Sequence, residues 1–289
     1  MIISDEWQDY ECISTSNGEK LERFNNIILV RPDPQIIWKI KKSNQWNKYD
    51  GYYHRSKEGG GYWEFKNKPT SHWIVNYKNL KFRVYPTNFK HVGLFPEQAT
   101  NWDYIIKKIN ASNLQEINAL NLFGYTGAAT VALASTKATE VVHVDASKKI
   151  NEWAKENIKL NNLSSKTVRY ITEDAIKFIE REKRRKRKYQ VVILDPPSYG
   201  RGPNKEVWKL ENNLVNILEK IKEILADDYL FVLINCYTTG FSSISLSNLL
   251  KLTFQEASIT AGEIGLPVTD GDLILPCGIY GRIENNIRR

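Results

Sequence analysis

The spacing of hydrophobic positions changes near residue 88. Before it, short apolar patches such as NNIILV, WIVNY and LKFRVY are set off by the turn segments SNG, RPDP and GGG. Short apolar runs bounded by Gly, Pro and Asn are typical of strands joined by tight turns. The sequence therefore predicts a β-rich N-terminal domain over residues 1–88.

From residue 89 to residue 289, strand-length apolar runs alternate with helical patterns. We expect strands at 117–122, 140–145, 167–171, 189–195 and 229–235, and helices at 96–109, 128–136, 147–161, 174–187, 205–226 and 243–252. Strands connected through helices indicate a doubly wound, mostly parallel α/β sheet with right-handed crossovers. At the end, ASITAGEIGLP and LILPCGIYGRIE flank TDGD, which predicts an antiparallel hairpin.

Composition narrows the class of protein. The three cysteines, Cys12, Cys236 and Cys277, are widely spaced. This argues against a disulfide framework or a zinc cluster and for a reducing compartment. The N-terminal MIISDEWQDY does not resemble a signal peptide, and the apolar runs are far shorter than the roughly 18 residues of a membrane span. We expect a soluble, cytoplasmic protein that binds no metal; the oligomeric state is left open.

The formal net charge of +8 suggests nucleic acid as a partner, but it is unevenly distributed. REKRRKRK (181–188) alone carries +6. This run ends a predicted helix and precedes a strand, so we expect it at the sheet edge opposite the ligand, either solvated or touching distant RNA phosphates. Residues 42–65 interleave aromatic and basic side chains. They are the better candidate for holding RNA, with sheet packing as the alternative.

The first strand–helix turn of the α/β region reads LNLFGYTGAAT (120–130). Gly124 and Gly127 are spaced G-x-x-G, not the G-x-G-x-x-G that holds a dinucleotide pyrophosphate, so a phosphate-free ligand fits better. Asp145 ends the second strand, where a carboxylate can accept hydrogen bonds from ribose hydroxyls. Asp174 follows the third strand, near the expected adenine edge. Together they predict S-adenosylmethionine as the cofactor.

These residues resemble a class I methyltransferase, and longer segments are similar to the bacterial family that groups with the large-subunit rRNA cytosine-5 methyltransferases. The similar segments are SNGEKLERF (16–24), LVRPDPQ (29–35), FKHVGLFPEQATNWDYI (89–105), LNLFGYTGAAT, DPPSYGRGPNKEVW (195–208), NCYTTGFS (235–242) and LPCGIYGR (275–282). Two departures are visible: Asn121 stands where many class I enzymes have an acidic residue, and residues 1–88 show no obvious match to an RNA-binding PUA domain.

The resemblance implies a seven-stranded sheet of order 3-2-1-4-5-7-6. It also implies a set of cofactor contacts: Phe95, Gln98, Gly124, Thr126, Asp145, Asp174 and Asp195. Four neighbours of these residues in the same motifs complete the candidate cofactor site: Asn121, Phe123, Gly127 and Ala146.

The fourth strand ends in VVILDPPSYG (191–200), which we assign to the methyl acceptor. Asp195 at a strand tip can take a proton, and Pro196 and Pro197 fix the turn. The alternative is a rigid loop that only supports the cofactor. In enzymes that methylate exocyclic amines an aromatic follows the prolines directly, whereas here Ser198 precedes Tyr199, so amine methylation is possible but not favoured.

Cys236 ends the fifth strand, beside the predicted position of Asp195. Methylation of cytosine carbon 5 needs a nucleophile that adds to carbon 6, and the RNA cytosine-5 enzymes carry such a cysteine in a similar context. The alternative is an inert, buried thiol. We interpret Cys277 and Cys12 as structural.

The sequence thus predicts an S-adenosylmethionine-dependent methyltransferase acting on a base of RNA, in particular rRNA, with cytosine carbon 5 as the favoured atom. Cys236 and Asp195 are the candidate catalytic residues, and Pro196, Pro197 and Tyr199 the candidate substrate contacts. A methyltransferase acting on protein or a small molecule, and a binding module that holds the cofactor without turnover, are the alternatives.

Overall fold

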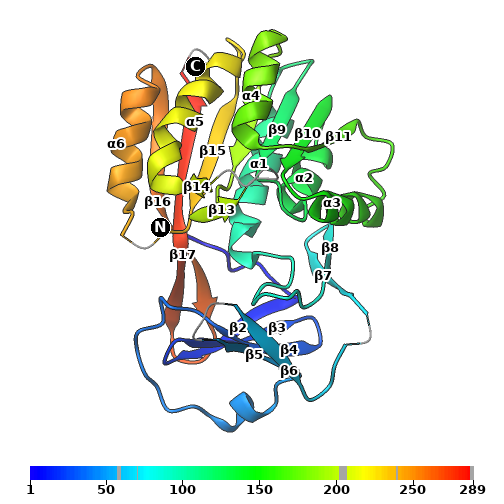
Figure 1. Ribbon diagram of the computed structural model, residues 1–289, viewed down its shortest axis with the longest axis vertical. Coiled ribbons are helices and arrows are strands. Elements are labelled where there is room, and N and C mark those ends of the chain that lie inside the picture. Colours follow the sequence, from blue (N-terminus) through cyan, green and yellow to red (C-terminus); the bar gives the residue numbers. More distant parts are fainter. Residues whose placement is uncertain (57–59, 70, 202–206, 239, 287–289) are drawn as a thin grey trace. The chain divides into compact units, whose positions relative to one another are not determined.

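The computed structural model describes residues 1–56, 60–69, 71–201, 207–238 and 240–286. The chain forms two compact units. The first consists of Met1–Thr100 and Ile264–Cys277, and the second of Asn101–Glu263 and Gly278–Arg289. Helices and strands are labelled in Figure 1.

The first unit is built from strands. They are β1 (Ile2–Ile3), β2 (Tyr10–Ser16), β3 (Glu19–Phe24), β4 (Ile27–Pro32), β5 (Gly51–Arg55), β6 (Gly61–Phe65), β7 (Trp73–Tyr77) and β8 (Leu80–Val84), with 3₁₀ turns η1 (Asn44–Asn47) and η2 (Pro96–Gln98). Strands β2 to β6 are neighbours in that order, and β7 and β8 form a separate antiparallel pair. Asn17 and Gly18, both with positive φ, make the tight turn between β2 and β3. The β-rich N-terminal region is confirmed.

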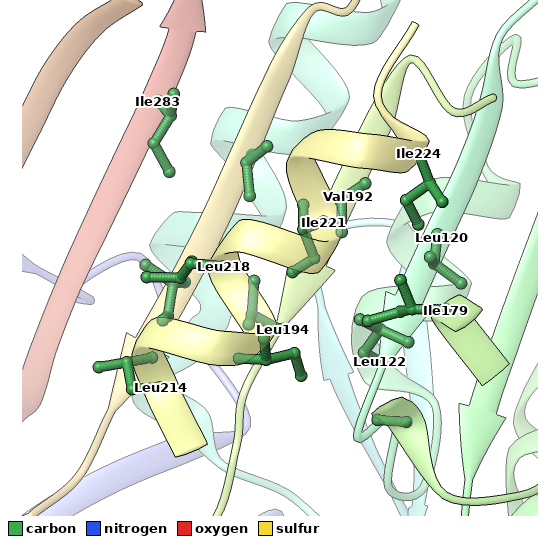
Figure 2. Packing of buried hydrophobic residues seen from close by; sticks show 14 of the residues in the cluster. Leu120, Leu122, Ile179, Val192, Leu194, Leu214, Leu218, Ile221, Ile224 and Ile283 are labelled. Carbon is green, nitrogen blue, oxygen red and sulfur yellow. The ribbon is translucent and has the colours of Figure 1, made fainter. Parts of the chain in front are cut away.

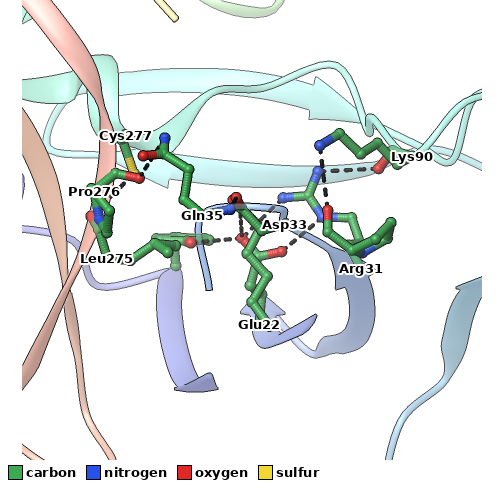
Figure 3. Close-up of polar contacts among 11 residues, drawn as sticks. Glu22, Arg31, Asp33, Gln35, Lys90, Leu275, Pro276 and Cys277 are labelled. Carbon is green, nitrogen blue, oxygen red and sulfur yellow. Dashed lines mark hydrogen bonds and ion pairs between the residues drawn. The ribbon is translucent and has the colours of Figure 1, made fainter. Parts of the chain in front are cut away.

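The LVRPDPQ segment belongs to a buried ionic cluster of the first unit (Figure 3). Arg31 donates to both carboxylate oxygens of Glu22, at 2.7 and 2.9 Å, and Lys20 lies 3.3 Å from Asp33. Burial alone would raise the pKa of Glu22, but the charges of Arg31 and Lys20 outweigh it and lower that pKa to about 2. The Tyr10 hydroxyl also donates to Glu22. Because these charges are paired, removal of one partner would leave an uncompensated charge buried in this unit.

The second unit alternates helices and strands. They are α1 (Ala99–Ala111), β9 (Asn118–Leu122), α2 (Ala128–Ala134), β10 (Glu140–Asp145), α3 (Lys148–Leu160), β11 (Val168–Thr172), α4 (Ala175–Arg184), β12 (Val191–Leu194), β13 (Tyr199–Arg201), β14 (Val207–Lys209), α5 (Leu210–Ile224), β15 (Phe231–Cys236), α6 (Ser243–Thr253), β16 (Ala257–Val268) and β17 (Leu273–Asn285). The strand order is β11-β10-β9-β12-β15-β17-β16 (Figure 1). The first five strands are parallel, and β17 is antiparallel to β15. The mixed α/β fold with a large, mostly parallel sheet is confirmed.

The start of α5 differs from the one expected. The helix predicted over 205–226 begins only at Leu210, because Val207–Lys209 pair with Tyr199–Arg201 as strands; residues 205 and 206 lie outside the described residues. The predicted hairpin at the chain's end is present as β16 and β17. Its residues Ile264–Cys277 belong to the first unit, where Ile264 pairs with Ile2 and Val268 with Cys12.

The main hydrophobic core lies between α5 and the sheet of the second unit. Apolar side chains of α5 recur at helical spacing, so they line one face of the helix (Figure 2). That face packs against side chains of β9, β12, β17 and α4. The labelled residues are Leu214, Leu218, Ile221, Ile224, Leu120, Leu122, Val192, Leu194, Ile283 and Ile179. This packing fixes the strands whose carboxyl ends carry the candidate site.

Candidate functional site

The turn after β9 has an unusual backbone. Phe123 and Tyr125 have φ values of 56° and 50°, and Gly127 has 83°. Left-handed backbone at residues other than glycine costs about 1–2 kcal/mol per residue, so the surrounding contacts must hold this turn. The Gly124 N–H donates to the Val144 carbonyl at 2.9 Å. The turn is therefore tied directly to the end of β10.

Packing, not only ligand access, requires the two glycines. A Cβ on Gly124 would lie 2.4 Å from Cε1 of His143, and one on Gly127 would lie 2.7 Å from Cβ of Ala154. His143 is fully buried, and burial lowers its pKa to about 4, so the ring is neutral at pH 7. Gly124 therefore makes room for this histidine.

Three hydrogen-bonded side chains support the turn after β9. Nδ2 of Asn121 donates to the Thr130 hydroxyl at 2.9 Å, and that hydroxyl lies 2.7 Å from Nδ1 of His143. All three side chains are buried. Asn121, the residue that departs from the acidic pattern, therefore acts in the support of the turn. The sequence analysis missed Thr130 and His143, although the presence of a histidine within the apolar strand VVHVD was a usable signal.

Asp145 joins the end of β10 to the turn. Its carboxylate accepts from the Tyr125 N–H at 3.0 Å and from the Ser147 N–H at 2.9 Å. Burial raises the pKa of Asp145, while these two donors act in the opposite direction. Each carboxylate oxygen can accept a further hydrogen bond, as ribose recognition would require. Ala146 lies between Asp145 and Ser147 and is half-buried.

Asp174 and Thr126 have structural partners. The Asp174 carboxylate accepts from the Lys177 N–H at 3.0 Å and caps α4, which is the ordinary role of an Asp at a helix start. The Thr126 side chain is buried, and its carbonyl accepts from Nδ2 of Asn157 at 2.8 Å. Contact of either residue with a cofactor stays a prediction.

Phe95 and Gln98 lie in the first unit, at the start and the end of the η2 turn. The Phe95 ring packs against His91 with ring centroids 5.3 Å apart, and the Gln98 N–H donates to the Phe95 carbonyl. Their role as cofactor contacts likewise stays a prediction.

Asp195 stands at the tip of β12, directly after Leu194. Burial raises its pKa to about 6. A carboxylate with a pKa near neutrality is suited to take a proton from a reacting group. Asp195 therefore has the electrostatic property expected of a general base.

The loop after Asp195 is fixed by Trp208, which the sequence analysis did not single out. The Trp208 indole N–H donates to the Pro197 carbonyl at 2.6 Å, and its ring lies 4.9 Å from that of Phe123 in the β9 turn. Ser198 is 2.7 Å from the Thr238 hydroxyl. The Pro197 carbonyl thus already has a donor within the protein. Trp208 links the loop that follows Asp195 to the turn that follows β9.

The candidate substrate contacts differ in exposure. Pro196 is buried, Pro197 is exposed, and the Tyr199 side chain is 53% exposed. Tyr199 begins the β13–β14 pair, opposite Lys209. An exposed ring held by strand pairing near a proton acceptor is available for stacking. Of the three, Tyr199 and Pro197 are accessible to a substrate.

Cys236 is the last residue of β15 and is only 2% exposed. Burial strongly raises the pKa of its thiol, and the negative charge of Asp195 adds to the effect. The thiol is therefore neutral at pH 7. Since thiolate is the nucleophilic form, these surroundings favour an inert Cys236 unless substrate binding changes them.

Four of the seven basic residues in the run 181–188 form ion pairs with carboxylates. Its pairs are Arg181 with Glu173, Lys183 with Glu223, Arg185 with Glu182 and Arg187 with Glu140. Such pairs make these side chains part of the protein's own surface network. The structure favours the solvated interpretation of this run.

The residues at the ends of β9 and β10 fit an adenosine-containing cofactor. The tight turn through Gly124 and Gly127 brings backbone close to the strand ends, and Asp145 retains acceptor capacity for hydroxyl groups. Among the described residues, no cluster of three or more His, Cys, Asp or Glu side chains is suited to hold a metal. No helix in the described part of the chain is long and apolar enough to cross a membrane.

Comparisons with known proteins agree with this arrangement. Residues 43–259 match a family model described as S-adenosylmethionine-dependent methyltransferase. A SAM-dependent methyltransferase structure from Agrobacterium tumefaciens is 34% identical, with a TM-score of 0.91 over 98% of this chain and 93% of that one. A second solved structure, complexed with S-adenosylhomocysteine, is 16% identical with a TM-score of 0.77 over 96% of this chain and 76% of that one; it supports the fold alone.

Curated relatives extend the comparison to named proteins. Ribosomal RNA large subunit methyltransferase K/L from Buchnera aphidicola is 24% identical over 88% of this chain, and its counterpart from Pseudoalteromonas translucida is 29% identical over 53%. The chain spans 34% and 21% of the lengths of these relatives.

Proposed function

Because this chain belongs to the S-adenosylmethionine-dependent methyltransferase family, we propose that it methylates a base of ribosomal RNA. The methyl donor is S-adenosylmethionine. Asp195 carries the proposal, since its pKa of about 6 gives a proton acceptor directly after the end of β12. The names of the curated relatives support rRNA as the substrate.

In this proposal each group has a separate task. Asp145 and the β9 turn hold S-adenosylmethionine, which supplies an electrophilic methyl group when bound. Asp195 takes the proton that the target base loses on methylation. Tyr199, exposed beside the loop, stacks on the base. Trp208 holds the loop after Asp195 against the β9 turn, through its hydrogen bond to Pro197 and its ring contact with Phe123.

The methylated atom has two candidates, cytosine carbon 5 and a base nitrogen. Cytosine carbon 5 is the atom that the sequence favours, and the position of Cys236 at the end of β15 supports it. In this mechanism the Cys236 sulfur bonds to carbon 6, the methyl group goes to carbon 5, and Asp195 removes the carbon-5 proton so that the sulfur can leave. Burial keeps the Cys236 thiol protonated, so in this mechanism the thiol must lose its proton before the sulfur adds to carbon 6. Methylation of a base nitrogen needs no such step.

Mass analysis of rRNA nucleosides from cells with and without the gene tests the proposal. We expect one methylated nucleoside to disappear with the gene and return with the wild-type gene. Asp195→Asn should not restore it, and calorimetry with S-adenosylmethionine on this variant separates loss of the proton acceptor from loss of a cofactor contact. An unchanged set of nucleosides would leave a protein, a small molecule or cofactor binding alone as the function.

Cys236→Ala decides between the two target atoms. If the cysteine is the nucleophile, the variant loses turnover, and 5-fluorocytosine in the RNA traps the wild type covalently because fluorine does not leave as a proton does. If Cys236 only packs, Cys236→Ala costs about 1 kcal/mol of stability and keeps activity. Near-normal turnover in the variant would exclude the cytosine-5 mechanism.

A further inference from the structure

Four aromatic rings form a connected row on one face of the β5–β6 hairpin. The Tyr49 and Tyr52 ring centroids are 5.5 Å apart, edge to face. Tyr52 and His54 are stacked at 4.3 Å with an interplanar angle of 17°. His54 and Tyr62 are stacked at 5.0 Å and 28°. The row, hereafter the ring row, ends at Tyr62, whose side chain is 64% exposed.

Strand geometry places these rings together. His54 and Tyr62 are paired across the two antiparallel strands, and Tyr52 precedes His54 by two residues on the same face. Tyr53 points to the opposite face and is buried. Sheet packing uses Tyr53 and, in part, Tyr49 and Tyr52, which pack against a buried cluster that contains Trp46. The packing interpretation therefore applies to these residues, whereas Tyr62 stays exposed.

Hydrogen bonds hold the ring row in place before any ligand binds. The Tyr52 hydroxyl donates to Glu19, and Nε2 of His54 lies 2.8 Å from Glu64. The ammonium of Lys66 lies 3.9 Å from the Tyr49 ring centroid and covers that end. Tyr62 is therefore the end at which the stack can continue onto another planar group.

The chain around the ring row is strongly basic. Residues 37–68 carry seven basic and two acidic residues outside 57–59, a net charge of +5. Lys39, Lys41 and Lys48 are exposed, and within the described residues they form no ion pair with a carboxylate. In the basic run 181–188, Arg184, Lys186 and Lys188 likewise have no carboxylate partner within the described residues, but no row of stacked rings accompanies them. Lysines in the chain segment that leads into stacked rings complement a ligand that has both phosphates and planar bases.

We propose that the ring row and its lysines bind an unpaired RNA strand, with one base stacked on Tyr62 and the phosphates near Lys39, Lys41 and Lys48. This inference rests on the proposed action on RNA and assigns strand recognition to the first unit. The ligand is single-stranded because a double helix hides the base faces that stacking requires.

Binding of a fluorescently labelled, unpaired RNA of about 12 nucleotides to the full chain tests this surface. Tyr62→Ala should weaken binding roughly tenfold, and Tyr62→Phe should restore it because the ring remains. Replacing Lys39, Lys41 and Lys48 with Ser should reduce the slope of log affinity against log salt by about 2. The matched control, Arg184, Lys186 and Lys188 to Ser, removes the same charge and should change the slope less.

Three results would overturn the inference: wild-type affinity in folded Tyr62→Ala, equal slopes for the two triple variants, or preference for a fully paired RNA of the same sequence. The test is separate from the proposed function. If the variants lose RNA binding but the wild type does not methylate rRNA, the proposed function is wrong and the proposed RNA-binding surface stands. If the wild type methylates rRNA but the variants bind RNA as it does, the proposed surface is wrong and the proposed function stands.

Discussion

Asp145→Ala removes a side chain that joins the end of β10 to the β9 turn. The carboxylate accepts from the Tyr125 N–H at 3.0 Å and the Ser147 N–H at 2.9 Å. Hydrogen bonds to a charged group contribute about 1.5–3 kcal/mol each, and water replaces part of that contribution. Because Tyr125 has a left-handed backbone, its turn is expected to relax when this acceptor is lost. We therefore expect a loss of about 1–3 kcal/mol in the free energy of unfolding.

The same substitution should weaken S-adenosylmethionine binding by about 2–3 kcal/mol, or roughly 30- to 150-fold, since two predicted ribose hydrogen bonds disappear. Titration calorimetry measures the affinity, and thermal unfolding measures the stability of the same preparation. Asp227→Ala is a suitable control because Asp227 is exposed and lies before β15, at the end opposite the strand tips of the candidate site. It should change neither quantity appreciably.

Wild-type affinity in folded Asp145→Ala would refute the assignment of Asp145 to the ribose. Loss of stability with unchanged affinity would leave Asp145 as a support of the turn only. Loss of affinity without loss of stability would show that the two backbone hydrogen bonds are replaced by water.

Three further outcomes follow from the site. The rate of methyl transfer should rise as the pH increases past about 6, because Asp195 then loses its proton and can act as the acceptor. A wild-type rate that does not change with pH in this range would contradict that role. Gly124→Ala should destabilise the protein by more than about 2 kcal/mol in chemical denaturation, because its Cβ would lie 2.4 Å from His143. Trp208→Phe should lower kcat and leave S-adenosylmethionine affinity near wild type, since the Pro197 hydrogen bond is lost while an aromatic ring remains; unchanged kcat would exclude a positioning role.

The sequence was sufficient for the architecture and the family. The alternation of apolar runs with helical patterns predicted the strands from Asn118 to Cys236, because the spacing of apolar residues shows which face of a strand or helix is buried. The turn around Gly124 and the carboxylate Asp145 indicated the cofactor, which the family match confirms. The start of α5 was placed too early, because pairing between Trp208 and Gly200 sets it, and helical periodicity carries no sign of that pairing.

Tertiary structure decided the chemical state of the candidate residues. The sequence left 181–188 as either solvated or touching distant RNA phosphates, and only the fold shows that Glu140 and Glu223 from distant segments pair with it. The sequence likewise predicted Cys236 beside Asp195, but only the fold shows that burial and this carboxylate keep the thiol protonated. A side chain's charge depends on its desolvation and its neighbours, and these are assembled only when the chain folds. The residue types are set by the sequence, whereas their reactivity is set by the fold around them.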